Sequence, residues 1–416
     1  MNLITSPPRA DAGAIRVLVL APWAFRVPRH GGQLRGAAVV RAYRDAGHDV
    51  RIAAFYDGGR VGPDERWPDD IPILPGVSQA MQRPSARKDD SALAFWDAVA
   101  DAPDSFAAFA AAVRAAKPDL LQFEEPFLWP VVRRLRVEGY LDRTAVVHSS
   151  YNFETAAWRD LQAAGAGVTQ STLRDIAVLE QEIARSCDLV ISVSEGDAGE
   201  FRAVGARRVC VAANGTPSLS PPDRNPALDA YIPVDTPYAL FVSSAHPPNA
   251  HGLVEMAAGA SGHPLRHGEI MICGNVGSLV RTDPHFKAAG RVLGQARFLG
   301  WVENDLLGAL YAGCRAIILP KTMGGGSNLK TAEALASFRP IVATTRAFEG
   351  FEPFTGLPGV TIADEPDEFW CAVDGLLSGG DPVPPRPPEA MAGLLWSACL
   401  EPMVRAAESV VRERRR

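Results

Sequence analysis

The feature that most constrains the fold is a strand, loop, helix and strand pattern between residues 315 and 345. RAIILP and RPIVATT are short apolar runs with β-branched residues, bounded by proline, which is typical of buried parallel strands. Between them, Leu329, Ala332 and Leu335 fall on one face at helical spacing. Parallel strands joined by helices form sheets that are covered on both faces, so the sequence predicts an α/β fold.

A glycine-rich loop precedes the predicted helix. Gly324, Gly325 and Gly326 leave the backbone uncovered just before a helix start, where free N–H groups and the positive dipole end attract an anion. Ser327 or Asn328 is the expected N-cap. The loop therefore predicts either a tight turn or an anion site.

Lys330 is unusual for a purely structural helix. A cation in the first turn opposes the helix dipole, at a cost of about 0.3–1 kcal/mol, and a bound phosphate would turn that cost into a gain. The simpler alternative is an exposed lysine that pairs with Glu333 at i,i+3. This stretch alone does not decide between the two hypotheses.

The length and the Pro-rich stretch predict two domains. A chain of 416 residues with 47% hydrophobic content is too long for one ordinary core. Residues 217–236 are aperiodic and rich in proline, as in a linker. We expect Rossmann-like domains at 1–216 and 237–395, with a cleft between their strand carboxyl ends, and a helical tail at 396–416.

Composition and charge argue against several classes of protein. The formal net charge of −6 and the isoelectric point near 5.8 disfavour nucleic acid as the main partner. No apolar run has the length needed to span a bilayer, and the N-terminus lacks a signal-peptide pattern. The six cysteines form no CxxC pair and no metal-like spacing. We expect a cytoplasmic protein without a transmembrane segment, metal or other cofactor; peripheral membrane contact is compatible with this.

The first half carries two sets of polar candidates. Gly31 and Gly32 open a helix after the first strand, but the spaced G-x-G-x-x-G fingerprint is missing, so no nicotinamide site is expected. Glu124 ends another predicted strand, and neighbouring carboxylates on an extended chain point to opposite sides, which disfavours a catalytic pair with Glu125. His148 ends the next strand; a single histidine there is more often structural, although polar residues follow it.

Six phrases, in this order, carry a resemblance. They are YRDAGHDV, CDLVISVSEGD, ANGTP, ALFVSSAHPPN, FLGWVENDLLGALYAGCRAIILP and GGGSNLKTAEALASFRPIVAT. Together they resemble the retaining glycosyltransferases of the GT-B fold in the sequence group called family 4, over nearly the whole chain. The resemblance implies two Rossmann-like domains facing each other across a cleft, with a C-terminal helix returning towards the first. It also implies sugar transfer from a nucleotide-diphosphate donor to an acceptor hydroxyl with retention of configuration.

The resemblance assigns donor binding to both halves. Glu333 matches the glutamate that holds the ribose, and Lys330 matches the lysine that contacts the diphosphate, where it would also act in catalysis. The other implied donor-binding residues are Gly31, Gly32, Asn249, Gly325, Gly326, Ser327, Asn328 and Leu329.

The acceptor or sugar pocket is expected in the first half. Its candidates are Glu124, Tyr151, Asn152 and Glu154. Some relatives carry a histidine in an H-N-x-E phrase, which falls at Tyr151 if Asn152 and Glu154 are aligned. His148 is the competing match and our candidate catalytic residue from this half.

The sequence departs from the family pattern at Gly325, where many members carry a second glutamate that contacts the sugar. The expected partners remain a nucleotide-sugar donor and a glycan, lipid-linked or small-molecule acceptor, in bacterial glycan (polysaccharide) or glycosylated metabolite synthesis. Two alternatives are a sugar-nucleotide epimerase of the same fold and an inactive nucleotide-sugar-binding protein.

Overall fold

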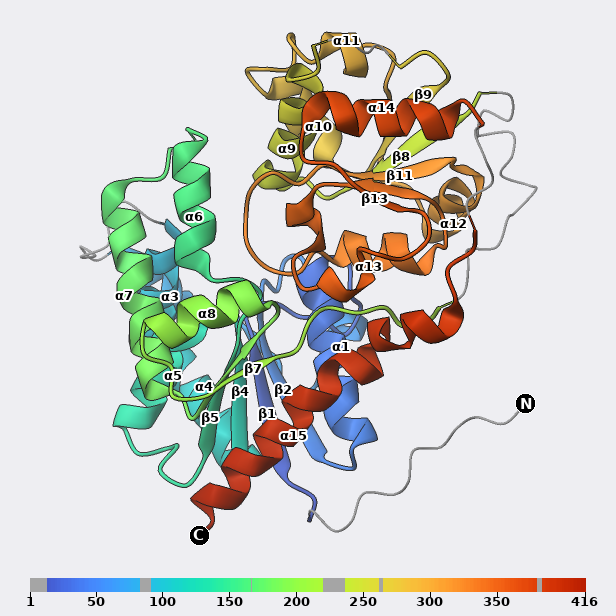
Figure 1. The fold of residues 1–416 in the computed structure, drawn as a ribbon. Coiled ribbons are helices and arrows are strands. Elements are labelled where there is room, and N and C mark those ends of the chain that lie inside the picture. The colour runs from blue at the N-terminus through green and yellow to red at the C-terminus, as the bar shows by residue number, and fades with distance from the viewer. Residues whose placement is uncertain (1–12, 83–90, 166, 220–235, 262–264, 380–383) are drawn as a thin grey trace.

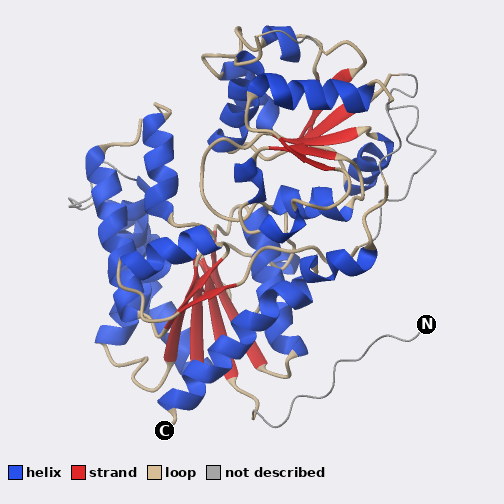
Figure 2. Cartoon of the chain, viewed as in Figure 1, coloured by secondary structure: helices blue, strands red, loops and turns tan. Residues whose placement is uncertain are grey.

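The computed structural model describes residues 13–82, 91–165, 167–219, 236–261, 265–379 and 384–416. It contains two α/β domains, each with one sheet between helices (Figures 1 and 2). This confirms the predicted architecture of two Rossmann-like halves.

A parallel sheet of seven strands forms the first domain, in the order β3-β2-β1-β4-β5-β6-β7. Its strands are β1 (Arg16–Ala21), β2 (Asp49–Tyr56), β3 (Ile71–Pro72), β4 (Leu120–Glu124), β5 (Ala145–Ser149), β6 (Leu189–Ser192) and β7 (Val209–Val211). The helices of this part of the chain are α1 (Gly31–Asp45), α2 (Pro75–Met81), α3 (Ser91–Asp101), α4 (Pro103–Ala116), α5 (Trp129–Val137), α6 (Glu154–Ala163), α7 (Gln170–Ser186) and α8 (Glu195–Ala203).

Alternation along β1 builds two separate cores in this domain. Leu18 and Leu20 pack with helices α2 to α5 and α7 on one face. Val17 and Val19 pack on the other face with α1 and with α15 (Trp396–Arg414). Successive side chains of a strand point to opposite faces, so a strand covered on both sides is apolar, as β1 is from Val17 to Ala21.

The second domain contains a parallel sheet of six strands in the order β10-β9-β8-β11-β12-β13. Its strands are β8 (Tyr238–Val242), β9 (Glu269–Cys273), β10 (Arg297–Gly300), β11 (Ala316–Leu319), β12 (Ile341–Ala343) and β13 (Val360–Ile362). Its helices are α9 (Pro247–Ala258), α10 (Val276–Thr282), α11 (Gly290–Leu293), α12 (Asn304–Gly313), α13 (Leu329–Ala336) and α14 (Pro366–Leu377).

The strand order reverses between β1 and β4 in the first sheet and between β8 and β11 in the second. Ligands of open α/β sheets bind beyond the carboxyl ends of the strands at such a reversal. Figure 1 shows α13 on the side of the second domain that faces the first, close to α1. The topology and this placement of α13 therefore predict a ligand site where the two domains meet.

The final helix, α15, returns to the first domain, as the resemblance implied. It lies across that domain in Figure 1, and Leu400, Met403 and Val404 enter the same core as β1. Thr216 and Leu395 form an isolated parallel bridge where the two chain segments that connect the domains run side by side. The predicted linker at 217–236 falls mostly outside the described residues.

The first domain also has regular structure in a proline-rich stretch. Residues 57–82 contain the short strand β3 and the helix α2. Pro72 is tolerated because β3 is the edge strand of the sheet. Within the described residues, no helix is both long and apolar enough to cross a membrane.

Candidate functional site

The glycine-rich loop connects β11 to α13 at the reversal point of the second sheet. Asn328 caps the helix, because its side-chain oxygen accepts a hydrogen bond of 3.1 Å from the Lys330 backbone N–H. Gly324 and Gly326 have φ angles of 81° and 75°, a region that favours glycine. The predicted loop and cap are confirmed, and Asn328 rather than Ser327 is the cap.

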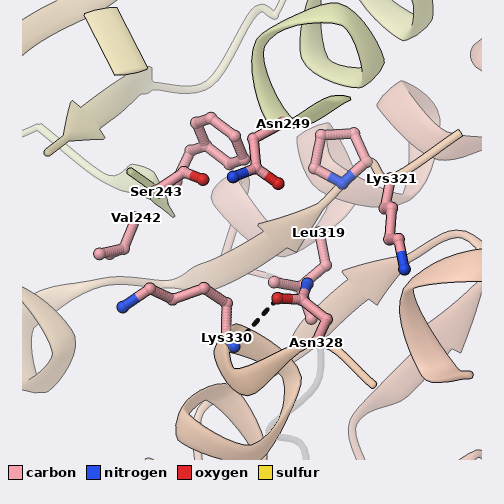
Figure 3. A pocket seen from close by; sticks show the side chains of 9 residues that line it. Val242, Ser243, Asn249, Leu319, Lys321, Asn328 and Lys330 are labelled. Atoms are coloured by element: carbon pink, nitrogen blue, oxygen red, sulfur yellow. Dashed lines mark hydrogen bonds between the residues drawn. The ribbon is translucent and has the colours of Figure 1, made fainter. Parts of the chain in front are cut away.

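A hollow of about 270 Å³ opens beside this loop, at the carboxyl ends of β8 and β11 (Figure 3). Asn249 reaches it from the first turn of α9, and Asn328 and Lys330 reach it from the start of α13. The other lining residues are Phe241, Val242, Ser243, Leu319, Pro320 and Lys321. Three predicted donor-binding residues therefore share one hollow.

Lys330 and Glu333 form an ion pair, with 2.8 Å between Nζ and Oε2. The Tyr311 hydroxyl also donates to Glu333 Oε2, at 3.2 Å. The two charged side chains are 29% and 32% exposed, so both remain accessible to a ligand. The structure thus contains the i,i+3 ion pair that the simpler hypothesis predicts. The pair also lies at the edge of a hollow, as the ligand-binding hypothesis requires.

The start of α1 faces the start of α13 across the domain boundary. Gly31 and Gly32 are the first two residues of α1, and the side chain of the N-cap residue, His30, makes no capping hydrogen bond. A Cβ on Gly31 would lie 2.9 Å from Leu329 Cδ1 of α13. Two positive helix ends from different domains therefore meet here, an arrangement that favours a ligand with more than one negative charge.

Tyr151 and Asn152 border the glycine-rich loop from the first domain. The Tyr151 hydroxyl donates to the Gly32 carbonyl oxygen at 3.1 Å. A Cβ on Gly326 would lie 2.4 Å from the Tyr151 carbonyl oxygen and 3.3 Å from Asn152 Cβ. Both residues thus lie where the two domains meet, beside the predicted donor-binding loop.

Glu124 and Glu154 are less accessible than expected for an acceptor pocket. Glu124 is 0% exposed and accepts a 2.7 Å hydrogen bond from Gln122, and burial raises the pKa of its carboxyl. Glu154 is 8% exposed and accepts a 2.7 Å hydrogen bond from Trp158 Nε1, and burial raises its pKa to about 7. The prediction that Glu124 contacts an acceptor is therefore wrong for this conformation, because its side chain is completely enclosed.

The predicted catalytic role of His148 is wrong. Its ring is 0% exposed, stacks on Phe123 with 4.8 Å between ring centroids, and meets Phe201 edge-on at 5.9 Å. Burial lowers the pKa of His148 to about 3, so the ring is neutral at physiological pH. Of the two competing matches to the histidine of the relatives, the structure places Tyr151 at the domain boundary and His148 in the core.

Sequence reasoning missed a buried polar connection between the domains. Arg35 of α1 is 1% exposed and donates from Nη1 to Asn214 Oδ1 at 3.1 Å. Asn214 then reaches the loop: its backbone N–H donates to Ser327 Oγ at 3.0 Å, and its Nδ2 donates to the Ser327 carbonyl oxygen at 2.8 Å. The ANGTP phrase marked this asparagine, but only as part of a resemblance and without a role.

Lys321 is a second cation that the sequence analysis did not single out. It lies two residues after the end of β11, and its side chain is 11% exposed. Its ammonium donates to the carbonyl oxygens of Gly325 and Gly326 at 3.0 and 3.2 Å, and Figure 3 shows it extending away from Lys330. Lys321 therefore stabilises the loop through two of its backbone carbonyl oxygens. The sequence signal that could have found it is a lysine two residues after a strand, at the carboxyl edge of the sheet where ligands bind.

Among the residues that the structure describes, no three His, Cys, Asp or Glu side chains are grouped so that they could hold a metal ion. The cations near the loop are instead Lys321, Lys330 and Arg346, the last with a hydrogen bond of 3.3 Å to the Gly324 carbonyl oxygen. Together with the two helix ends, these side chains make the site suited to an anion.

Comparison with known families matches both halves of the chain. Residues 30–215 match the family model described as "Glycosyl transferase 4-like domain", and residues 236–379 match "Glycosyl transferases group 1". No curated protein matches the sequence significantly.

Several solved structures share the fold. Sucrose-phosphate synthase from Thermosynechococcus elongatus is 15% identical with a TM-score of 0.63, covering 96% of this chain and 94% of the other. Trehalose-6-phosphate synthase OtsA is 14% identical with a TM-score of 0.61, covering 96% and 99%. Anabaena HepE, solved in complex with UDP-glucose, is 16% identical with a TM-score of 0.59, covering 95% and 98%. At such identities the likeness establishes the fold.

Proposed function

The chain belongs to the family 4-like glycosyltransferases of the GT-B fold, enzymes that transfer sugars from nucleotide sugars, and we propose that it does so with retention of configuration to an acceptor hydroxyl. The observation that carries the proposal is the meeting of two helix starts, α1 and α13, beside Lys330. Such a site suits a nucleoside diphosphate, whose negative charge grows as the bond to the sugar breaks.

Each donor-site residue then has a defined task. Lys330 leaves its ion pair with Glu333 and binds the diphosphate, where it stabilises the charge of the leaving group. Glu333 accepts hydrogen bonds from the ribose hydroxyls. The N–H groups of Gly325, Gly326 and Ser327 and the start of α1 complete the anion site, and Asn249 and Leu329 line it.

The first domain supplies the acceptor side. Tyr151 and Asn152 lie at the domain boundary, next to the loop that would hold the diphosphate. Acid–base work by Glu124 or His148 is not part of the proposal, because both side chains are fully buried. A donor phosphate oxygen that takes the acceptor's proton is compatible with this arrangement.

Positive helix ends and Lys330 take the place of a cation, so the proposed reaction needs no metal and no cofactor beyond the nucleotide sugar. We propose a cytoplasmic enzyme of bacterial glycan or glycosylated metabolite synthesis, with a glycan, lipid-linked or small-molecule acceptor.

The test is a panel of UDP-, GDP- and ADP-sugars, each incubated with the enzyme and a set of sugar, lipid-linked and small-molecule acceptors. Release of nucleoside diphosphate that depends on the acceptor supports transfer, and NMR of the product reports whether the anomeric configuration is retained. Epimerisation of the donor without an acceptor would instead identify an epimerase. Donor binding without turnover across the panel would indicate an inactive binding protein.

A further inference from the structure

Two carboxylates of the first domain bind the backbone of the glycine-rich loop. Asp160 lies on α6 and Asp197 lies in the first turn of α8. Asp160 accepts from the Gly324 N–H at 3.0 Å, and Asp197 accepts from the Gly326 N–H at 3.1 Å. The loop N–H groups at both positions therefore already hold negatively charged oxygens.

Asp160 also pairs with a cation of the second domain. Its Oδ2 lies 2.6 Å from Arg346 Nη2, and Arg346 Nε donates to the Gly324 carbonyl oxygen at 3.3 Å. These three residues form a closed ring of contacts across the domain boundary. The side chains of Asp160 and Arg346 are 33% and 38% exposed, so solvent and ligands can reach the pair.

Asp197 is fixed more firmly on its own side. It is 6% exposed, its Oδ1 accepts from the Phe153 N–H at 3.0 Å, and its Oδ2 accepts from the Ser194 hydroxyl at 2.8 Å. Its Oδ1 also lies 3.1 Å from the position that a Cβ on Gly325 would take. A side chain at position 325 would therefore press on this carboxylate, which explains why glycine suits the loop there.

We propose that Asp160 and Asp197, with Gly324, Gly326 and Arg346, form an interdomain latch that holds the two domains together and that must be released before the donor diphosphate can bind. The inference rests on the proposed function, in which the Gly326 N–H held by Asp197 binds a phosphate oxygen, while the contact of Asp160 with Gly324 and Arg346 holds the same boundary closed. Carboxylate and phosphate oxygens accept the same kind of charge-assisted hydrogen bond, so they compete for one N–H.

The latch has a measurable consequence for affinity. If only the released form accepts a nucleotide, the apparent dissociation constant exceeds the intrinsic one by the inverse of the released fraction. Weakening the latch raises that fraction, so removing a carboxylate near the site should tighten nucleotide binding. A residue that merely lines the site in the loaded enzyme would have the opposite effect.

The test is calorimetric titration of UDP, ADP and GDP into the wild-type enzyme, Asp160→Ala and a matched control, Asp188→Ala. Asp188 accepts from the Val146 N–H at 2.8 Å and pairs with Arg414 at 2.7 Å, with 27% and 31% exposed side chains, so it copies the contacts of Asp160 away from the loop. We expect Asp160→Ala to bind the preferred nucleotide roughly 3- to 10-fold more tightly. Asp160→Asn keeps an acceptor oxygen without the charge, so its nucleotide affinity should lie between those of the wild type and Asp160→Ala.

Unchanged or weaker binding by Asp160→Ala, or equal tightening in Asp188→Ala, would overturn the latch while leaving the proposed function intact. Failure of the wild-type enzyme to bind any nucleoside diphosphate would count against the proposed function. Small-angle scattering of the nucleotide-free proteins decides the latch independently. Asp160→Ala should have a larger radius of gyration than the wild type and Asp188→Ala, and equal radii would contradict the proposal.

Discussion

Lys330 and Glu333 offer the sharpest test of the donor site, because their ion pair has two opposed interpretations. As a surface pair at i,i+3, with each side chain about one third exposed, it contributes no more than about 0.5 kcal/mol to the free energy of unfolding. As a donor site, the two side chains bind different parts of the ligand. Substituting them separately therefore distinguishes the hypotheses by their effects on binding and turnover.

Glu333→Gln should weaken nucleoside diphosphate binding. Loss of charged hydrogen bonds to the ribose costs about 1–3 kcal/mol, or roughly 5- to 150-fold in the dissociation constant. The substitution also releases Lys330 from its 2.8 Å pair and so lowers the cost of turning it towards phosphate. We therefore expect the lower part of that range, with a smaller effect on kcat unless remote binding energy positions the sugar.

Lys330→Ala should reduce both binding and chemistry. The diphosphate carries its largest charge in the transition state, so kcat should fall on the order of 10²-fold, as for other lost charge-stabilising donors. The measurements are calorimetric titration with UDP, ADP and GDP and initial rates of nucleotide release.

Glu138→Gln is a suitable control for both variants. Glu138 pairs with Arg134 at 2.8 Å, with 40% and 35% exposed side chains, in the first domain and away from the loop. This control should change neither binding nor turnover. Unchanged nucleotide affinity in both Glu333→Gln and Lys330→Ala would refute the assignment of the donor site.

Three further outcomes are expected. Activity should survive incubation with a chelator; loss that Mg²⁺ or Mn²⁺ restores would contradict the metal-independent mechanism. Gly326→Ala should lower the free energy of unfolding by at least about 1–2 kcal/mol and impair donor binding, because φ is 75° and the new Cβ would lie 2.4 Å from the Tyr151 carbonyl oxygen. Thermal unfolding checks this against Gly290→Ala, where a Cβ meets nothing within 4 Å. His148→Phe should keep its activity and lose less stability than the wild type as pH falls from 6.5 towards 3, because burial lowers the histidine pKa to about 3 and only the unfolded chain takes up the proton in that range. Acid unfolding curves that coincide for the wild type and His148→Phe would contradict this expectation.

The strand, loop and helix of the proposed donor site could be predicted because their signals are local. The apolar run of β11, the glycines, the cap at Asn328 and the first turn of α13 follow one another within a few residues. Strand, turn and helix preferences act over this distance, so periodicity and capping rules are sufficient.

The groups that bind the loop from the first domain could not be predicted in the same way. Asp160, Asp197 and Asn214 lie 164, 129 and 113 residues from their partners. Those partners are mostly backbone groups of a glycine-rich loop, which carry no side-chain signal of their own. Only the packing of the two domains reveals these contacts.

The error at His148 has a different origin. The predicted strand ended at this histidine, which would have placed the next turn at the cleft, but β5 continues to Ser149. All five residues of β5 are buried, and the histidine ring fills a space between Phe123 and Phe201. The histidine thus lies one residue before the strand end, where β5 is still buried between covered faces.

The return of α15 to the first domain has a consequence for the way the protein is made. Val410 and Val411 belong to the same core as Val17 and Val19, although nearly the whole chain separates them. A ribosome delivers α15 after the second domain, so the part of the first sheet's apolar face that α15 covers stays exposed while the second domain is synthesised. The domain that emerges first is thus completed only after the second one, and this exposed face is where chaperones would act on the nascent chain.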